Sequence, residues 1–193
     1  MANENIDTSE FQFKGKHADY VRKLTSELDT RTKFKIFQYN VDVLIFAPIV
    51  GMIYGRKGNL DNNNSINPIK INYQQLTSRS SALDYNKELI LLLNKKETVD
   101  INERINKAFR YIYDNKEETK DKKNECEKEY LEYVLGGVEI LFEKIMEYNS
   151  PRDIDDYIDN LFEFVTDIKE KTCSTMSDDE LYNLCLSAEN KQK

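Results

Sequence analysis

Hydrophobic residues are unevenly distributed along the chain, and the densest apolar block runs from residue 41 to residue 54. This block, VDVLIFAPIVGMIY, carries one charge, Asp42. Asn40 can cap the free amide groups at the start of a helix, and Asp42 is favourable in a first helical turn. Pro48 removes one backbone donor, so we expect it to kink or break the helix. We predict a buried central helix and keep a strand as the alternative, because periodicity does not separate the two in a fully buried run. The expected core positions are Val43, Phe46, Ile49 and Gly51.

The residues before the block predict a polar arm followed by one amphipathic helix. Residues 1–13 are polar and unpatterned, and we interpret them as a mobile arm whose Phe11 and Phe13 could dock elsewhere. Residues 16–28 carry apolar side chains at helical spacing, so we predict a helix that ends near Asp29. After the block, residues 59–68 have the composition of a loop, and residues 69–73 alternate apolar and polar positions. A short strand, or an arm folded over the core, would explain that alternation.

The second half of the chain shows a series of helical patterns. Residues 130–146 are amphipathic, with a Gly136-Gly137 pair that would permit a close helix approach or mark a bend. Ser150 and Pro151 predict the start of a helix through about residue 171, with Ile154, Ile158, Leu161, Val165 and Ile168 on one face. The other predicted helices cover residues 81–93, 101–113, with a stripe of Ile101, Ile105, Ala108, Phe109 and Ile112, and 177–188. Residues 115–129 lack an apolar stripe, and a helix or a mobile charged loop would fit them.

These patterns predict a mainly α protein: a multi-helix domain with a buried central helix and at most a minor β element. We divide the chain into an arm (1–13), a helical core with a basic surface (14–96) and an acidic helical half (97–193). Residues 1–96 carry 14 Lys and Arg against 10 Asp and Glu, and residues 97–193 carry 14 against 25, so the net charges are +4 and −11. The two halves would form one compact domain or two closely packed subdomains.

The cysteines, the N-terminal residues and the length of the apolar block indicate in which part of the cell we expect the protein. The three cysteines, Cys126, Cys173 and Cys185, have no close pair, which favours a reducing cytoplasm. The N-terminal residues lack a basic start and an apolar segment, so we do not expect export. The central block is shorter than the roughly 20 residues that span a bilayer, so we expect no membrane insertion.

Few residues are arranged for catalysis or metal binding. The single histidine, His17, lies on a predicted surface helix, where a solvent-facing or capping role is the simplest interpretation. The cysteines are too dispersed for a zinc site. The Asp153, Asp155, Asp156 and Asp159 group could bind Mg²⁺ in a phosphoesterase or nuclease, but acids also favour a helix start. Glu118-Thr119-Lys120 has the letters of a nuclease motif without the strand that such a motif needs. We therefore expect no enzyme, no cofactor and no metal.

The turn after the central block is the best candidate contact site. Gly55 to Gly58 holds Arg56 and Lys57, which could touch a phosphate or an acidic partner; the alternative is a helix C-cap with basic neighbours. The basic N-terminal half leaves open a small DNA-binding regulator. In that alternative, the other cations of the N-terminal half would contact the DNA: Lys14, Lys16, Arg22, Lys23, Arg31, Lys33 and Lys35.

The block NVDVLIFAPIVGMIYGRKG resembles a pattern shared by small accessory proteins encoded beside bacterial DNA-modification and anti-phage operons. The matching positions are Asp42, Ala47, Gly51, Gly55 and Arg56. The acidic C-terminal half is similar to the small third subunit of Lamassu-type defence complexes, in which an SMC-like ATPase senses foreign DNA and a nuclease effector is held inactive. The resemblance implies an accessory, scaffolding role without catalytic residues. With the missing catalytic groups and the two electrostatically distinct halves, it leads us to expect a cytoplasmic, non-enzymatic subunit that bridges such an ATPase and effector. The 12 tyrosines fit an interaction role, because tyrosine is enriched at interface cores.

Overall fold

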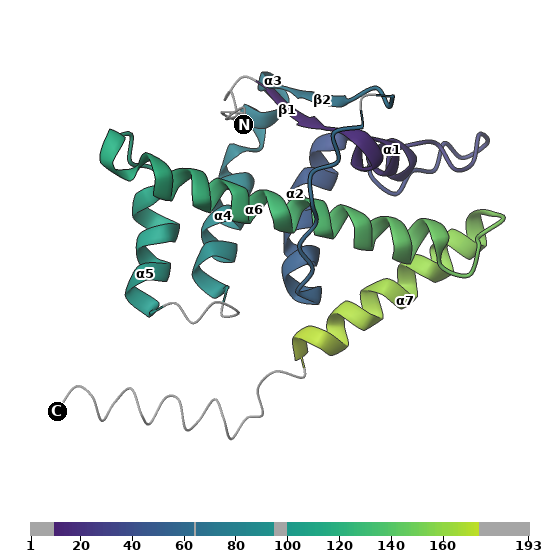
Figure 1. Ribbon diagram of the computed structural model, residues 1–193. Coiled ribbons are helices and arrows are strands. Elements are labelled where there is room, and N and C mark those ends of the chain that lie inside the picture. Colours follow the sequence, from purple (N-terminus) through teal and green to yellow (C-terminus); the bar gives the residue numbers. More distant parts are fainter. Residues whose placement is uncertain (1–9, 64, 95–99, 174–193) are drawn as a thin grey trace.

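The computed structural model describes residues 10–63, 65–94 and 100–173, and this part of the chain is mainly α-helical, as predicted (Figure 1). The α-helices are α1 (Gly15–Leu24), α2 (Asn40–Tyr54), α3 (Tyr73–Ser78), α4 (Ser80–Leu93), α5 (Ile101–Asn106), α6 (Lys120–Leu141) and α7 (Ile154–Cys173). Shorter helical turns are η1 (Lys107–Tyr111), η2 (Glu117–Thr119) and η3 (Phe142–Glu147). Strands β1 (Glu10–Phe13) and β2 (Ile69–Asn72) form one antiparallel pair.

The apolar block forms the central helix α2, so the strand alternative is wrong. The cap residue is Tyr39 rather than Asn40, and the Tyr39 backbone N–H donates to the Asp42 carboxylate at 2.9 Å. The helix continues through Pro48. One turn earlier, the buried Asn86 side chain of α4 donates to the backbone carbonyl of Ile45 at 2.8 Å. Pro48 has no backbone N–H to donate to the carbonyl of Leu44, and the bond from Asn86 reaches the next carbonyl in the chain, that of Ile45.

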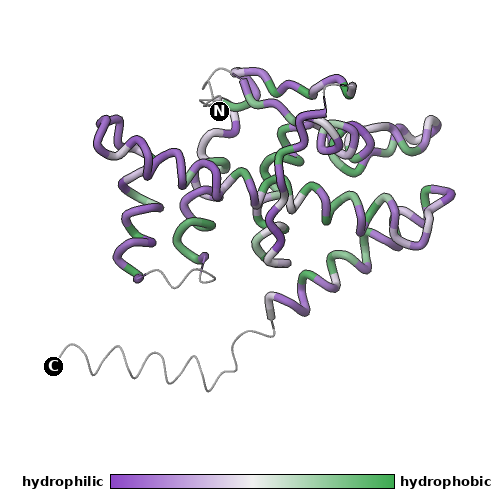
Figure 2. Tube along the Cα trace, viewed as in Figure 1, coloured by the Kyte–Doolittle hydropathy of each residue, from purple (hydrophilic) through white to green (hydrophobic). Residues whose placement is uncertain are grey.

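Helix α2 crosses the middle of the long helix α6, and glycines make the crossing tight (Figure 1). A Cβ atom on Gly137 would lie 1.7 Å from the carbonyl oxygen of Ala47 in α2. A Cβ atom on Gly51 would lie 2.2 Å from the carbonyl oxygen of Tyr133 in α6. The Gly136-Gly137 pair therefore serves the close helix approach, one of its two predicted roles. Figure 2 shows hydrophobic residues gathered along α2 at this crossing.

The small sheet corrects the boundary of the predicted arm. Residues 10–13 form β1, with Phe11 opposite Ile71 and Phe13 opposite Ile69. Phe13 and Ile71 are fully buried. The alternation of Phe11, Gln12 and Phe13 is the pattern of a half-buried strand, and its partner is the alternating segment that the sequence marks at residues 69–73. Residues 1–9 lie outside the described part of the chain.

The expected core positions on α2 are only partly correct. Val43 and Gly51 are buried, and Ile49 is partly buried. Phe46 is 55% exposed and contacts Phe37, with ring centroids 5.8 Å apart, so its assignment to the core is wrong. Residues four apart share a helix face, and Phe46 follows Asp42 by four positions, on the side of α2 that faces away from α6.

The C-terminal half contains two helices whose starts differ from expectation. Helix α6 begins at Lys120, so most of residues 115–129 are helical. Helix α7 begins at Ile154 instead of after Ser150, because the Asp153 carboxylate accepts from the backbone N–H groups of residues 155 and 156 at 3.1 Å. The predicted helix at 177–188 lies outside the described residues. Among the helices of the described ranges, none has the length and apolar character required to span a membrane.

Candidate functional site

The predicted contact residue Arg56 is bound within the protein. It follows Gly55, which ends α2 in the left-handed conformation at φ 63°. The guanidinium donates to both carboxylate oxygens of Glu143 in η3, at 2.6 and 2.8 Å. Its Nη2 also lies 3.0 Å from Glu139 of α6. The bonds to Glu143 are the main reason that the pKa of Arg56 is raised. Arg56 therefore ties the end of α2 to α6 and η3.

Glu139 is the centre of a wider ion cluster, the Glu139 cluster, which sequence analysis missed. Its members are Lys16, His17, Arg56, Glu139 and Glu143. Glu139 is 7% exposed, and its carboxylate lies 2.8 Å from Lys16 Nζ and 3.1 Å from His17 Nε2. Burial raises the pKa of Glu139, but the bonds from Lys16 and His17 outweigh that effect and lower it below its usual value.

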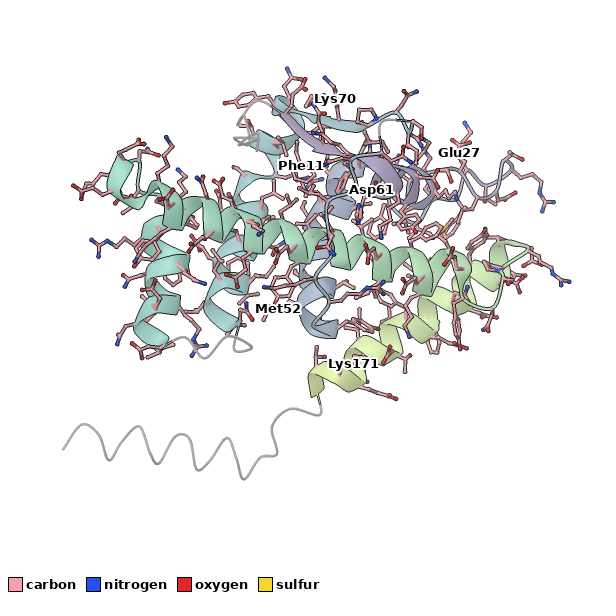
Figure 3. The ribbon with its side chains drawn as sticks, in the orientation of Figure 1. Phe11, Glu27, Met52, Asp61, Lys70 and Lys171 are labelled. Atoms are coloured by element: carbon pink, nitrogen blue, oxygen red, sulfur yellow. The ribbon has the colours of Figure 1, made fainter. Side chains whose placement is uncertain are left out.

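His17 is buried, so the expectation of a solvent-facing histidine is wrong. It is 1% exposed and lies on the buried face of α1 with Val21 and Leu24. The spacing of these three residues, four and then three positions, is the signal that would have placed it there. Burial lowers the pKa of His17, and the Glu139 carboxylate only partly offsets this, so the imidazole is held toward its neutral form. Figure 3 labels Asp61, whose carboxylate accepts from the Lys16 backbone N–H at 2.7 Å beside this cluster.

Several basic residues of the N-terminal half also contact acidic or aromatic groups of the same chain. Lys57 Nζ lies 3.5 Å from Glu132 and 5.1 Å from the centroid of the Tyr133 ring. Lys23 pairs with Asp19 at 2.9 Å, and Arg22 donates to the backbone carbonyl of residue 67 at 2.9 Å. These cations stabilise the fold.

The acidic group at the start of α7 caps the helix. Asp153 holds two backbone amides, as described above, and the Asp156 carboxylate accepts from the Arg152 backbone N–H at 2.8 Å. In the part of the chain that the structure describes, no group of three or more His, Cys, Asp or Glu side chains is placed to hold a metal ion. Asp153 and Asp156 thus serve the helix start, one of the two roles that the sequence left open for this group.

The other candidate chemical groups have ordinary surroundings. Cys126 is buried, and burial raises the pKa of its thiol to about 11, which keeps it protonated at neutral pH. Glu118 and Lys120 lie on η2 and at the first residue of α6, so the nuclease-like letters stand on a helical segment. Neither feature brings a reactive group together with a base.

Helix α7 presents an apolar surface to solvent, and we call it the α7 face. It consists of Ile158, Phe162 and Val165, which are 45%, 72% and 55% exposed. Their spacing of four and three residues puts them on one side of the helix. The adjoining side of the helix, which includes Phe164 and Leu161, packs on the core. Ile158, Leu161 and Val165 lie on one side of the helix, as their spacing predicts, but only Leu161 is partly buried against the core, while Ile158 and Val165 are exposed.

Contacts with α2 hold α7 in this orientation. The Tyr54 hydroxyl donates to the Asp167 carboxylate at 2.7 Å, and the Tyr54 ring stacks on Phe164 with centroids 6.2 Å apart. Burial, followed by the bond to Asp167, raises the pKa of Tyr54 and keeps its hydroxyl protonated. Lys144 and Lys171, the latter labelled in Figure 3, lie 3.3 and 3.5 Å from Asp167. These contacts hold the adjoining side of α7 against α2 and η3, so the α7 face has a fixed orientation.

A second apolar surface, the α5 face, lies near the other end of α6. Ile101, Ile105 and Phe109 repeat every four residues along α5 and η1, and they are 48%, 44% and 51% exposed. Ala108 and Ile112 of the same predicted stripe point into a small hydrophobic cluster with Leu91, Tyr111 and Cys126. The predicted single stripe is therefore divided between a buried and an exposed side. Exposed apolar groups on neighbouring turns of a helix are typical of a protein-binding surface.

The model of the family described as "DNA sulphur modification system-associated protein 4" matches residues 11–183, which is most of the chain. No curated protein and no solved structure matches it.

Proposed function

The chain belongs to the family described as DNA sulphur modification system-associated protein 4, and from this premise we propose that it is a non-enzymatic subunit that joins two protein partners within such a system. The family places it among accessory proteins of a DNA-modification system. The pairing of two exposed apolar faces, the α5 face and the α7 face, is the observation that carries the proposal.

The arrangement of the two faces supports binding to two partners. Helix α6 has 22 residues, which corresponds to a length of about 33 Å at 1.5 Å per residue. The α5 face belongs to elements that contact the N-terminal part of α6, while α7 packs against η3, which extends the C-terminal end (Figure 1). In Figure 1, α5 and α7 lie on opposite sides of α2, so two partners on these faces would not compete for the same surface.

The chemistry of the described residues supports a binding role over a catalytic one. The charged groups of the Glu139 cluster are bound to one another, and the acidic group of α7 caps its helix. Lys23 and Lys57 likewise pair with Asp19 and Glu132 of the same chain. A subunit that acts by holding other proteins together needs none of these groups for chemistry.

We further propose that the two partners are an SMC-like ATPase and a nuclease effector, and that the assembly works in the cytoplasm. An accessory subunit that links a sensor to an effector requires two independent surfaces. The acidic side chains beside the α7 face, Asp155, Asp159 and Glu163, favour a partner with a basic surface there. The α5 face would then hold the second partner.

Co-purification of variants tests the proposal. The tagged protein is expressed with the other proteins of the DNA sulphur modification system, as wild type, Phe162→Asp or Phe109→Asp. Full burial of a phenylalanine contributes about 1.5–3 kcal/mol, so burying the exposed part of Phe162 would contribute roughly 1–2 kcal/mol, about tenfold in affinity. We expect each variant to lose one partner and keep the other.

Leu60→Asp is the matched control, because Leu60 is 54% exposed and belongs to neither face. It should retain both partners. Circular dichroism of each purified variant checks that it is folded. Folded Phe162→Asp and Phe109→Asp proteins that both keep every partner would refute the two-face proposal.

A further inference from the structure

A pocket of about 420 Å³ lies between the sheet and helices α3, α4 and α6, outside both faces and the Glu139 cluster. Its size falls within the roughly 300–1,000 Å³ of typical ligand sites. Its wall includes Phe11, Leu44, Leu76, Leu83, Tyr130 and Leu131. Figure 3 labels Phe11, which comes to the pocket from β1. Most of these side chains are apolar, so the pocket is suited to hydrophobic groups.

One polar group in the pocket wall lacks a partner. Tyr130 of α6 is 9% exposed, and its hydroxyl is buried without a hydrogen bond to any described residue. A buried tyrosine hydroxyl normally finds a partner, because leaving it unpaired has an energetic cost. Burial and the nearby charge of Asp84 raise the pKa of Tyr130, so the hydroxyl keeps its proton and can donate. A hydrogen-bond acceptor on a bound ligand would give the Tyr130 hydroxyl the partner that it lacks among the described residues.

The rim of the pocket is acidic. It carries the carboxylates of Glu10, Asp84 and Glu127 against one cation, Lys87. Glu10 already pairs with Lys70 at 3.0 Å, and the Lys87 ammonium lies 5.5 Å from the Tyr130 ring centroid. Asp84 and Glu127 have no ion-pair partner among the described residues. Two uncompensated carboxylates beside an apolar wall complement a ligand that combines hydrophobic and basic groups.

We propose that this pocket binds a basic amphipathic helix of a partner protein. Apolar side chains of that helix, one turn apart, enter the pocket against Leu44 and Leu83, and a flanking Lys or Arg pairs with Asp84 and Glu127. This is the helix-in-groove mode of recognition, in which apolar anchors recur at helical spacing. The inference rests on the proposed function, because it identifies the chemistry of one partner segment of the interaction subunit.

Photo-crosslinking in the full assembly tests the pocket. Tyr73 lines the pocket and is 60% exposed, so Tyr73→p-benzoyl-phenylalanine places a photoreactive ring at its edge. The same amino acid at Phe162 reports on the α7 face. Both proteins are co-expressed with the other proteins of the modification system, irradiated, and analysed by mass spectrometry. We expect the Tyr73 probe to mark one partner segment with apolar residues at helical spacing and adjacent Lys or Arg.

Charge reversal supplies the matched comparison. Asp84→Lys with Glu127→Lys should lower the Tyr73 crosslink yield about fivefold, as expected for the loss of two surface ion pairs. Glu118→Lys with Asp121→Lys makes the same change in charge outside the pocket and should leave the yield unchanged.

The crosslinks at Tyr73 and Phe162 distinguish failure of the pocket proposal from failure of the proposed function. A Phe162 crosslink without a Tyr73 crosslink refutes the pocket proposal and leaves the proposed function intact. A Tyr73 crosslink to an acidic segment, or a small molecule retained in the pocket in place of a protein, also refutes the pocket proposal. The absence of any partner crosslink from both positions refutes both.

Discussion

Replacing Gly137 by alanine tests whether the close contact of α2 and α6 organises the fold. At a solvent-exposed helix position, Gly→Ala would stabilise the protein by about 1 kcal/mol, because alanine has the higher helix propensity. At position 137 the new Cβ atom would lie 1.7 Å from the Ala47 carbonyl oxygen and 2.4 Å from the Ala47 carbonyl carbon. These are backbone atoms, so relief requires a shift of α2.

The higher helix propensity of alanine stabilises the protein and the clash with Ala47 destabilises it, and the clash is the larger effect. Insertion of one methyl group into a well-packed core typically costs about 1–3 kcal/mol, even where side chains can yield. Here the contact is with backbone on both sides, and the neighbouring contact of Gly51 with Tyr133 resists the same movement. We therefore expect a net loss of about 2 kcal/mol in the free energy of unfolding.

Urea denaturation followed by circular dichroism at 222 nm measures this loss. With a denaturant slope of about 2 kcal/mol per molar urea, the midpoint of Gly137→Ala should fall by about 1 M. Asn124→Ala is the control, because Asn124 is an exposed residue of the same helix and should gain a few tenths of a kcal/mol. A Gly137→Ala midpoint equal to or above that of the wild type would show that the helices do not meet as described.

Three further predictions concern the Glu139 cluster and the pocket. His17 has a lowered pKa in the folded protein, so the unfolded chain binds more protons and the free energy of unfolding should fall as pH drops below about 6.5. His17→Gln should show a shallower dependence of the urea midpoint between pH 7.5 and 5.5, and an unchanged slope would contradict the buried, neutral imidazole. Arg56→Ala should lower the free energy of unfolding by about 1 kcal/mol; this value is kept small because the Arg56 side chain is 40% exposed. Lys57→Ala should change the free energy of unfolding by less than about 0.5 kcal/mol. In a filter-binding assay neither variant should alter DNA affinity, whereas the alternative of a DNA-binding regulator requires salt-sensitive binding that falls in both. Tyr130→Phe removes a hydroxyl without a partner among the described residues, so the urea midpoint should stay the same or rise; a loss of more than about 1 kcal/mol would indicate a hydrogen bond in the free protein.

The helices of this protein could be predicted from its sequence because their apolar residues follow the helical period. The central block was more difficult, since apolar residues surround α2 on all sides and conceal which side meets α6. The exposed position of Phe46 follows from Asp42, one turn before it, and that signal is weak in a single helix. The glycines of α6 indicate a close helix contact only when Gly51 and Ala47 of α2 are known to lie beside them, and this is known from the fold and not from the sequence.

The candidate sites depend more strongly on tertiary structure. Arg56 was identified as a cation in a turn, but its partners, Glu139 and Glu143, come from residues more than 80 positions away. A histidine is polar, so the pattern of apolar residues alone does not show that His17 shares the buried face of α1 with Val21 and Leu24. On α7, Ile158 and Leu161 fit one helical stripe in sequence, and only the packing of Phe164 against Tyr54 shows which of them faces solvent.

The most direct test of the central proposal is native mass spectrometry of the tagged wild-type protein, purified after co-expression with the other proteins of its DNA sulphur modification system. We predict one assembly in which this chain is present in stoichiometric amount with an ATPase and a nuclease. Recovery of the chain alone, with both other proteins expressed and soluble, would contradict the proposal that it is their connecting subunit.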